Sequence, residues 1–143
     1  MFMGEYAHNI DKKGRITIPA TFRKDFKDTL VATRGMDGCL ALYTEEQWAI
    51  IYEQLLKLPM TKKDARDYVR KLTGKAKRCE FDELGRILLP SNLIKHAQLT
   101  KECMIVGVAN HVEIWSKERY EIQDESSDET FEDIAENLTE YLL

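Results

Sequence analysis

The sequence predicts a mixed α+β, β-rich protein made of two tandem modules related by a pseudo-two-fold, with short helices and a C-terminal acidic helix. Three observations predict this class: a segment of about 45 residues occurs twice, β-rich runs dominate each copy, and acidic residues concentrate near the C-terminus. At 143 residues, the chain can bury a core but is too short for a large cofactor-binding enzyme with a second domain.

The repeat is clearest around two short motifs. Residues 10–19 (IDKKGRITIP) return as residues 81–90 (FDELGRILLP), at a spacing of 71. The match then continues through Gly35 and Gly107 at a spacing of 72, and a repeat of this kind constrains the whole fold. The predicted organisation is a first module at 5–48, a helical connector at 49–75, a second module at 76–120 and an acidic helical tail at 121–143.

Each copy contains an Asp-x-x-Gly tetrad, at 11–14 and again at 82–85. Aspartate supplies the side-chain acceptor that a type I turn favours, and glycine permits a positive φ. We therefore expect each tetrad to close a β-hairpin with strands on both sides. A second hairpin is expected later in each copy, from the β-rich runs 30–33 with 39–43 and 103–106 with 112–115.

Helices are predicted by their start signals. Short helices are expected at Pro19 and Pro90, because proline suits the first helical position. Thr44 followed three residues later by Gln47 forms a capping box at the start of the connector. A second connector helix is expected over 61–73.

Charge is distributed unevenly along the chain. The net charge is −4, but residues 118–143 hold ten acids and one base, which leaves +5 on residues 1–117. A basic body with an acidic tail suits an anionic partner. In the tail, Ser126 and Glu129 form a capping pattern, and an apolar stripe should dock the helix on the body or on a neighbouring subunit. The stripe consists of Phe131, Ile134, Ala135, Leu138 and Leu142.

Several classes of protein are excluded by what the sequence lacks. No apolar run approaches the roughly 18 residues of a membrane span, and no secretory signal is evident, so a cytoplasmic protein is expected. Three cysteines without C-x-x-C spacing are interpreted as small buried side chains, with no metal. Because nucleotide-binding and hydrolase motifs are lacking, we expect no enzyme, cofactor or small-molecule substrate. The scattered histidines receive no catalytic role: His8, His96 and His111.

The two Asp-x-x-x-Arg motifs, each followed by apolar residues and proline, resemble the paired SpoVT/AbrB-type modules of the MraZ family. The resemblance covers nearly the entire chain, including 1–6 (MFMGEY), 33–40 (TRGMDGCL), 58–66 (LPMTKKDAR) and 114–117 (IWSK). It implies swapped-hairpin β-barrel modules and a ring-like homo-oligomer. It also implies a cytoplasmic, nucleoid-associated transcriptional regulator of the bacterial division and cell-wall gene cluster, which binds double-stranded promoter DNA carrying short direct repeats.

The chemistry of the first turn is consistent with DNA binding. Arg15 leaves this turn beside Lys12 and Lys13, and a two-stranded ribbon can fit a major groove. A guanidinium can bind a phosphate or a guanine edge in bidentate fashion, while lysines supply point charge. Asp11, with Gly14 completing the turn, is expected to accept turn hydrogen bonds and to orient the arginine. Two cations on the following helix could extend a phosphate-contacting face or form an ordinary solvated helix side: Arg23 and Lys24.

The second turn differs in charge. It has Glu83 and Leu84 where the first has lysines, so residues 82–86 carry −1 against +2 on residues 11–15. We therefore assign DNA reading to the first turn. Arg86 is expected to pair with the aspartate of its own motif, Asp82 beside Gly85, or across a subunit contact. Three cations before the second turn restore some positive charge and leave its role open: Lys75, Lys77 and Arg78.

An alternative function keeps the fold but changes the target. AbrB-like modules also serve as antitoxins, in which an acidic C-terminal segment neutralises a protein partner. The acidic amphipathic tail favours this alternative, whereas the presence of two modules instead of one favours the regulator. Promoter binding and partner capture distinguish the two.

Overall fold

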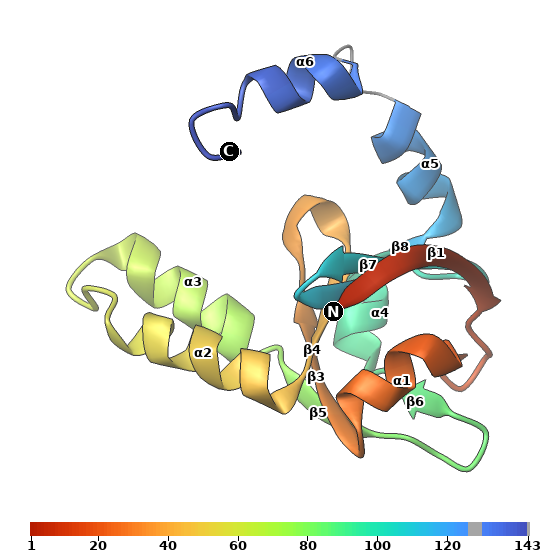
Figure 1. The fold of residues 1–143 in the computed structure, drawn as a ribbon. Coiled ribbons are helices and arrows are strands. Elements are labelled where there is room, and N and C mark those ends of the chain that lie inside the picture. Colours follow the sequence, from red (N-terminus) through yellow and green to blue (C-terminus); the bar gives the residue numbers. More distant parts are fainter. Residues whose placement is uncertain (126–129, 143) are drawn as a thin grey trace.

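Each repeat supplies four strands and a short helix in the same order. The computed structural model describes residues 1–125 and 130–142 (Figure 1). The first repeat forms β1 (Phe2–Asn9), β2 (Arg15–Thr17), α1 (Ala20–Phe26), β3 (Thr29–Arg34), the 3-10 turn η1 (Met36–Gly38) and β4 (Leu40–Tyr43). The second forms β5 (Lys77–Glu80), β6 (Arg86–Leu88), α4 (Ser91–His96), β7 (Glu102–Ala109) and β8 (His111–Ser116). Helices α2 (Glu45–Leu56) and α3 (Lys63–Thr73) connect them, and α5 (Lys117–Glu125) and α6 (Phe131–Glu136) follow.

The two repeats exchange strands. The larger sheet has the order β1-β7-β8-β4-β3-β5, which reads the same when the repeats are interchanged. β1 pairs with β7 of the second repeat, and β5 of the second repeat pairs with β3 of the first. β2 and β6 form a separate two-stranded sheet. Strands of the two repeats are therefore interleaved in one sheet, which fits the tandem modules expected from the sequence. The module boundaries and closure of the sheet into a barrel stay predictions.

The tetrads form turns but do not close hairpins. In the first tetrad Asp11 N–H donates to the carbonyl of Arg15 at 2.9 Å, Gly14 N–H donates to that of Asp11 at 3.0 Å, and Gly14 has φ +90°. The flanking strands then separate, because β1 pairs with β7 and β2 pairs with β6. The predicted hairpin partners were therefore wrong at both tetrads. One repeat alone offers too little apolar surface to bury a hairpin face, and pairing with the other repeat supplies the rest.

The later hairpins and the connector agree with the sequence patterns. β3 pairs with β4 and β7 with β8, both antiparallel. The Thr44 hydroxyl caps α2 by accepting from the Gln47 N–H at 3.0 Å, and α3 begins at Lys63, two residues later than expected. Pro19 and Pro90 occupy the cap position, one residue before α1 and α4 begin.

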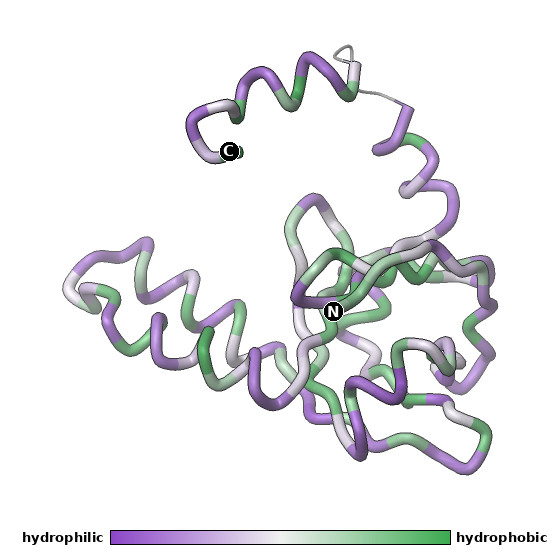
Figure 2. Tube along the Cα trace, viewed as in Figure 1, coloured by the Kyte–Doolittle hydropathy of each residue, from purple (hydrophilic) through white to green (hydrophobic). Residues whose placement is uncertain are grey.

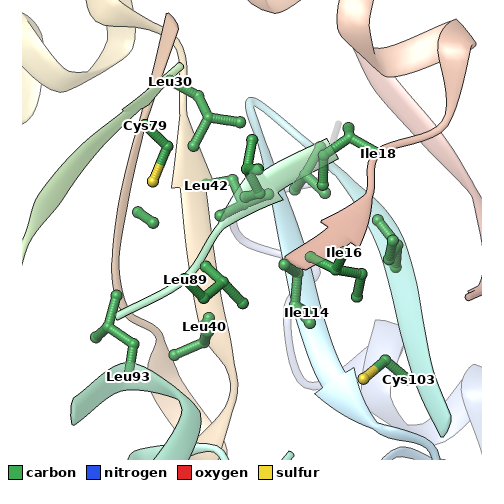
Figure 3. Close-up of a cluster of buried hydrophobic side chains, with 14 of the residues drawn as sticks. Ile16, Ile18, Leu30, Leu40, Leu42, Cys79, Leu89, Leu93, Cys103 and Ile114 are labelled. Atoms are coloured by element: carbon green, nitrogen blue, oxygen red, sulfur yellow. The ribbon is translucent and has the colours of Figure 1, made fainter. Parts of the chain in front are cut away.

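One core joins both repeats. Figure 3 shows buried side chains from β2 of the two-stranded sheet, from the large sheet and from α4 pointing toward one another. Its members include Ile16, Ile18, Leu30, Leu40, Leu42, Leu89, Leu93 and Ile114. Burying aliphatic side chains to this degree contributes about 1.5–3 kcal/mol each, so this shared core stabilises both repeats together.

The cysteines are part of this buried interior. All three are free thiols, and each is buried. Burial raises the pKa of Cys39 to about 12 and that of Cys103 to about 11, and it also raises the pKa of Cys79. A thiol held protonated is a poor nucleophile and a poor metal ligand. The interpretation of these residues as small buried side chains is therefore confirmed.

The tail leaves the body after β8. Helix α5 lies beside the sheet, where the Tyr120 hydroxyl bonds to Glu5 and the Tyr120 ring lies 5.7 Å from that of Trp115. The predicted cap at Ser126 and Glu129 lies outside the described residues. Instead, Thr130 and Asp133 form a capping box at the start of α6.

The apolar stripe of the tail is not docked on this chain. Figure 2 shows hydrophobic positions interspersed along a mainly hydrophilic tail. Phe131 is 82% exposed, Leu142 is 60% exposed, and Ile134 and Leu138 are more than two-fifths exposed. Of the two predicted docking places, the chain's own body is therefore excluded. None of the described helices is long and apolar enough to cross a bilayer.

Candidate nucleic-acid interface

A single carboxylate organises the first turn. One oxygen of Asp11, Oδ1, accepts from the backbone N–H groups of Lys13 and Arg15, each at 2.9 Å. The other, Oδ2, accepts from Nε of Arg15 at 2.7 Å. These hydrogen bonds, led by the one from the Arg15 backbone, lower the pKa of Asp11. The same carboxylate thus holds both the turn and the direction of the guanidinium.

The second turn repeats this arrangement. Asp82 accepts from the backbone N–H groups of Leu84 and Arg86 at 2.9 Å, and from Nε of Arg86 at 2.7 Å. Arg86 does pair with the aspartate of its own motif, within the fold. Because Arg15 pairs with Asp11 at the same distance, this ion pair does not distinguish the two arginines.

The two arginines lie on one face of a shared ribbon. We call β2 and β6, with the turns at 11–14 and 82–85, the β2–β6 ribbon. Its register pairs Arg15 with Leu88 and Thr17 with Arg86. Ile16 and Ile87 pair between them and are buried, so alternation along each strand places both arginines on the opposite, outer face. The two motifs predict two separate turns, and neither motif indicates that the turns share one ribbon.

Each turn is also held by the other repeat. Ile18 N–H donates to the carbonyl of Gly85 at 3.0 Å, and Leu89 N–H donates to that of Gly14 at 2.9 Å. Both glycines have positive φ, which favours glycine over any side chain. The turns therefore depend on the strand exchange, and they are fixed in position relative to each other.

Arg23 lies at the second turn although it comes from the first repeat. Its Nη1 donates to the carbonyl of Ile18 at 2.5 Å, and the guanidinium covers Gly85 so closely that a Cβ there would be 2.4 Å from Nη1. The equivalent residue of the second repeat, Ile94, covers Gly14 in the same way. Arg23 thus lies at the second turn, and Lys24 is exposed on α1. A phosphate-contacting role for these two cations stays a prediction.

These positions modify the charge difference between the turns. Adding Arg23 to residues 82–86 brings the second turn from −1 to zero, while residues 11–15 keep +2 with Lys12 and Lys13 exposed. Arg78, which could have added charge, is held by Glu45 through two hydrogen bonds of 2.8 and 2.9 Å. The first turn remains the more cationic end of the ribbon.

The outer edge of Arg15 is available to a ligand. Asp11 engages Nε, and within residues 1–125 and 130–142 no acceptor bonds to the terminal nitrogens of Arg15. A guanidinium held in this way presents two parallel N–H groups, the geometry that phosphate oxygens or the O6 and N7 atoms of guanine accept. A two-stranded ribbon that carries two such groups can enter a major groove.

Other kinds of site are not formed by the described residues. Throughout the described ranges, no three His, Cys, Asp or Glu side chains converge as metal ligands. The structure does bring Arg34 and His96 together around a cavity, which sequence analysis missed. These residues are 62 positions apart and share no motif, so no sequence signal could have paired them.

The fold and the ribbon define a tandem-repeat α+β protein whose repeats exchange strands to present paired arginines. A family model described as "MraZ protein, putative antitoxin-like" matches residues 1–71 and again residues 72–141. The chain is 52% identical over its full 143 residues to the "Transcriptional regulator MraZ" of Ligilactobacillus salivarius, and 48% identical to that of Pediococcus pentosaceus, covering all of both relatives. The chain belongs to the MraZ family, which is a family of transcriptional regulators and not of enzymes.

Proposed function

We propose that this protein regulates transcription by binding double-stranded DNA in a sequence-specific manner through the β2–β6 ribbon. The observation that carries the proposal is the pair of aspartate-held arginines on one exposed face of a two-stranded ribbon. The names of the relatives, which call them transcriptional regulators, support it. Base readout needs donors held in a fixed direction, and the aspartates supply that direction.

The residues of the ribbon would divide the work. Arg15 reads base edges or a phosphate, while Lys12, Lys13 and Lys24 neutralise phosphates. Arg23 supports the second turn through its bond to the Ile18 carbonyl. The first turn leads because it carries the larger positive charge.

Several copies of the ribbon would act together. Two modules in one chain give two non-identical outer surfaces, and contacts of that heterologous kind close into rings when the rotation permits. A ring-like homo-oligomer would engage short direct repeats in a promoter with avidity. The resemblance to the MraZ family suggests the division and cell-wall gene cluster as the target, in a cytoplasmic, nucleoid-associated protein.

Fluorescence anisotropy with DNA of one, two and three repeats, and with scrambled DNA, tests this proposal. The intact protein should prefer repeated elements, and its mass by light scattering should be several times 16.7 kDa. Arg15→Ala should lose the preference for operator over scrambled DNA. Lys57→Ala is the matched control, because it removes one exposed charge from the end of α2, outside the ribbon. Equal losses for both variants, or a monomer that does not distinguish one element from three, would contradict the proposal.

A second candidate function rests on the exposed tail. The family description contains the word antitoxin, and the apolar stripe of α6 is free to receive a protein partner. Under this candidate, removing the tail would abolish capture of the partner and leave DNA binding unchanged. The antitoxin candidate does not predict that Arg15→Ala loses the preference for operator DNA, whereas the regulator does. Testing Arg15→Ala and the tail truncation together therefore distinguishes the two candidates.

A further inference from the structure

Two buried polar atoms beside one cavity have no hydrogen-bond partner among the described residues. The cavity, about 230 Å³, lies where the end of β3 meets α3 and the end of α4, and Arg34 and His96 both line it. Arg34 Nε and His96 Nε2 are inaccessible to solvent, and neither bonds to any group within the described ranges. An unmet hydrogen bond of this kind costs about 1–3 kcal/mol, so its occurrence twice at one cavity requires an explanation.

The cavity is cationic at one side. Lys71 of α3 also lines it, and none of the lining residues is acidic. Burial lowers the pKa of His96, and the nearby cations Arg34 and Arg119 lower it further. The imidazole therefore lies in surroundings that lack a negative charge.

The other walls are apolar. Tyr43, Tyr68, Leu72 and Met36 complete most of the lining. Burial raises the pKa of Tyr43, so its phenol stays neutral. The volume is below the roughly 300–1,000 Å³ of sites for drug-sized ligands, so any occupant is small.

We propose that this cavity binds a carboxylate carried on a small flat or branched apolar group. The carboxylate would accept from Arg34 and His96 once their side chains turn toward the cavity, because Arg34 Nε and His96 Nε2 are closed to solvent before a ligand binds. Lys71 would add charge, while the apolar group would lie against Tyr43 and Tyr68. A guanidinium matches the planar carboxylate better than a lysine would. The strongly hydrated phosphate dianion suits the apolar walls less well. The carboxylate can belong to a free small molecule or to a residue of a second copy of this chain.

The site lies close to the ribbon. His96 ends α4, and Ile94 of the same helix covers Gly14 of the first turn. An occupant that bonds to His96 would therefore restrain the helix that holds the DNA-reading turn. A ligand in this cavity would thereby modulate the DNA binding proposed above. The test measures ligand binding without DNA, so its outcome does not depend on that proposed function.

The test uses the full chain with benzoate as probe, benzamide as the neutral isostere and inorganic phosphate as a second anion. Binding is followed by the imidazole NMR signal of His96, assigned with His96→Gln, and by the melting temperature. Benzoate should shift the His96 signal and raise the melting temperature in a saturable manner, and benzamide should change neither. Arg34→Gln should weaken benzoate binding by about tenfold or more, as expected for one charge-assisted hydrogen bond. Lys95→Gln, an exposed neighbour outside the cavity, should leave the affinity unchanged.

The remaining outcomes separate the two sources of the carboxylate. If benzoate does not bind, but Arg34→Gln lowers the mass of the assembly while Lys95→Gln does not, a second copy supplies the carboxylate and the proposal stands. No effect of benzoate together with an unchanged assembly would overturn it. Equal binding of benzoate and benzamide, or tighter binding of phosphate, would overturn it as well. Arg34→Gln removes an unpartnered buried group, so the variant should fold.

Discussion

The arginines of the β2–β6 ribbon owe their position to one neighbour each. In both turns a carboxylate takes two backbone N–H groups and one Nε, so the guanidinium direction is set before any DNA arrives. The side chain of Arg15 is 35% exposed and that of Arg86 is 26% exposed. Holding a long side chain in advance lowers the entropy that binding must overcome.

The two arginines should nevertheless differ when replaced. Arg15→Ala should lower specific affinity by about 1–3 kcal/mol with folding intact, whereas Arg86→Ala should chiefly lower stability or assembly. The reason is the surrounding charge, because Lys12 and Lys13 flank Arg15 while Glu83 precedes Arg86. Titrations against operator and scrambled DNA at several salt concentrations, with thermal melts, decide this. Equal losses of affinity with unchanged melting would remove the asymmetry.

The lysines should behave differently from the arginines. Lys12→Ala should weaken binding to all DNA sequences alike and lower the slope of log affinity against log salt by about one. Lys12 is exposed, so the fold should not change. The same anisotropy titrations measure this slope. A loss confined to operator DNA would instead assign base readout to Lys12.

The turn carboxylates give a pH dependence of known sign. The pKa values of Asp11 and Asp82 are lowered, first by the backbone N–H groups of Arg15 and Arg86. A carboxyl whose pKa falls on folding stabilises the fold above its unfolded pKa, and this contribution is lost as the pH falls through the folded pKa. The melting-temperature difference between the intact protein and Asp11→Asn should be constant from about pH 8 to pH 5 and shrink below about pH 4. A constant difference down to about pH 2 would contradict this.

Secondary-structure elements were predictable where the signal is local. The repeat, the tetrads, Pro19, Pro90 and the Thr44 cap identify strands, turns and helix starts from neighbouring residues. Strand partners were not predictable, because a tetrad specifies a turn and not which strand pairs with the next one. The same limit explains the site: the roles of Asp11 and Asp82 follow from their spacing, but the contact of Arg23 with the other repeat depends on the exchange.

The α2–α3 connector is attached to the sheet by few polar contacts, and one of them is buried. The Thr33 hydroxyl, fully buried on β3, donates to the carbonyl of Leu72 in the last turn of α3 at 2.6 Å. Thr33→Val removes this donor and leaves the carbonyl unmet, so it should lower the free energy of unfolding by about 1–3 kcal/mol. Thr73→Val is the control, because the hydrogen bond that its hydroxyl makes in the described part of the chain lies within α3, to the carbonyl of Val69 at 2.7 Å. Urea denaturation of both variants checks this, and equal losses would contradict a special role for Thr33.

The whole molecule combines a basic body with an acidic tail, and the body does not bury the apolar stripe of that tail. The apolar stripe of α6 is exposed on this chain, so a neighbouring copy is the remaining one of the two docking places that the sequence predicted. In the ring-like oligomer proposed above, each subunit would carry both the paired arginines and the tail. Whether the tail opposes DNA depends on where its charge lies relative to the ribbons.

Truncation after Glu125 separates an electrostatic role from a structural one. Residues 126–143 carry six acids and no base, so their removal changes the net charge from −4 to +2. We expect tighter DNA binding at low salt, because the field of the tail opposes the approach of phosphates. The two proteins should converge at high salt, since screening limits the effect to about 10 Å at 0.1 M. A variant with Phe131 and Ile134 replaced by serine retains every charge, so it should lose assembly without gaining this affinity at low salt. If truncation leaves the DNA affinity unchanged and makes the assembly smaller, the tail joins subunits and does not oppose DNA binding.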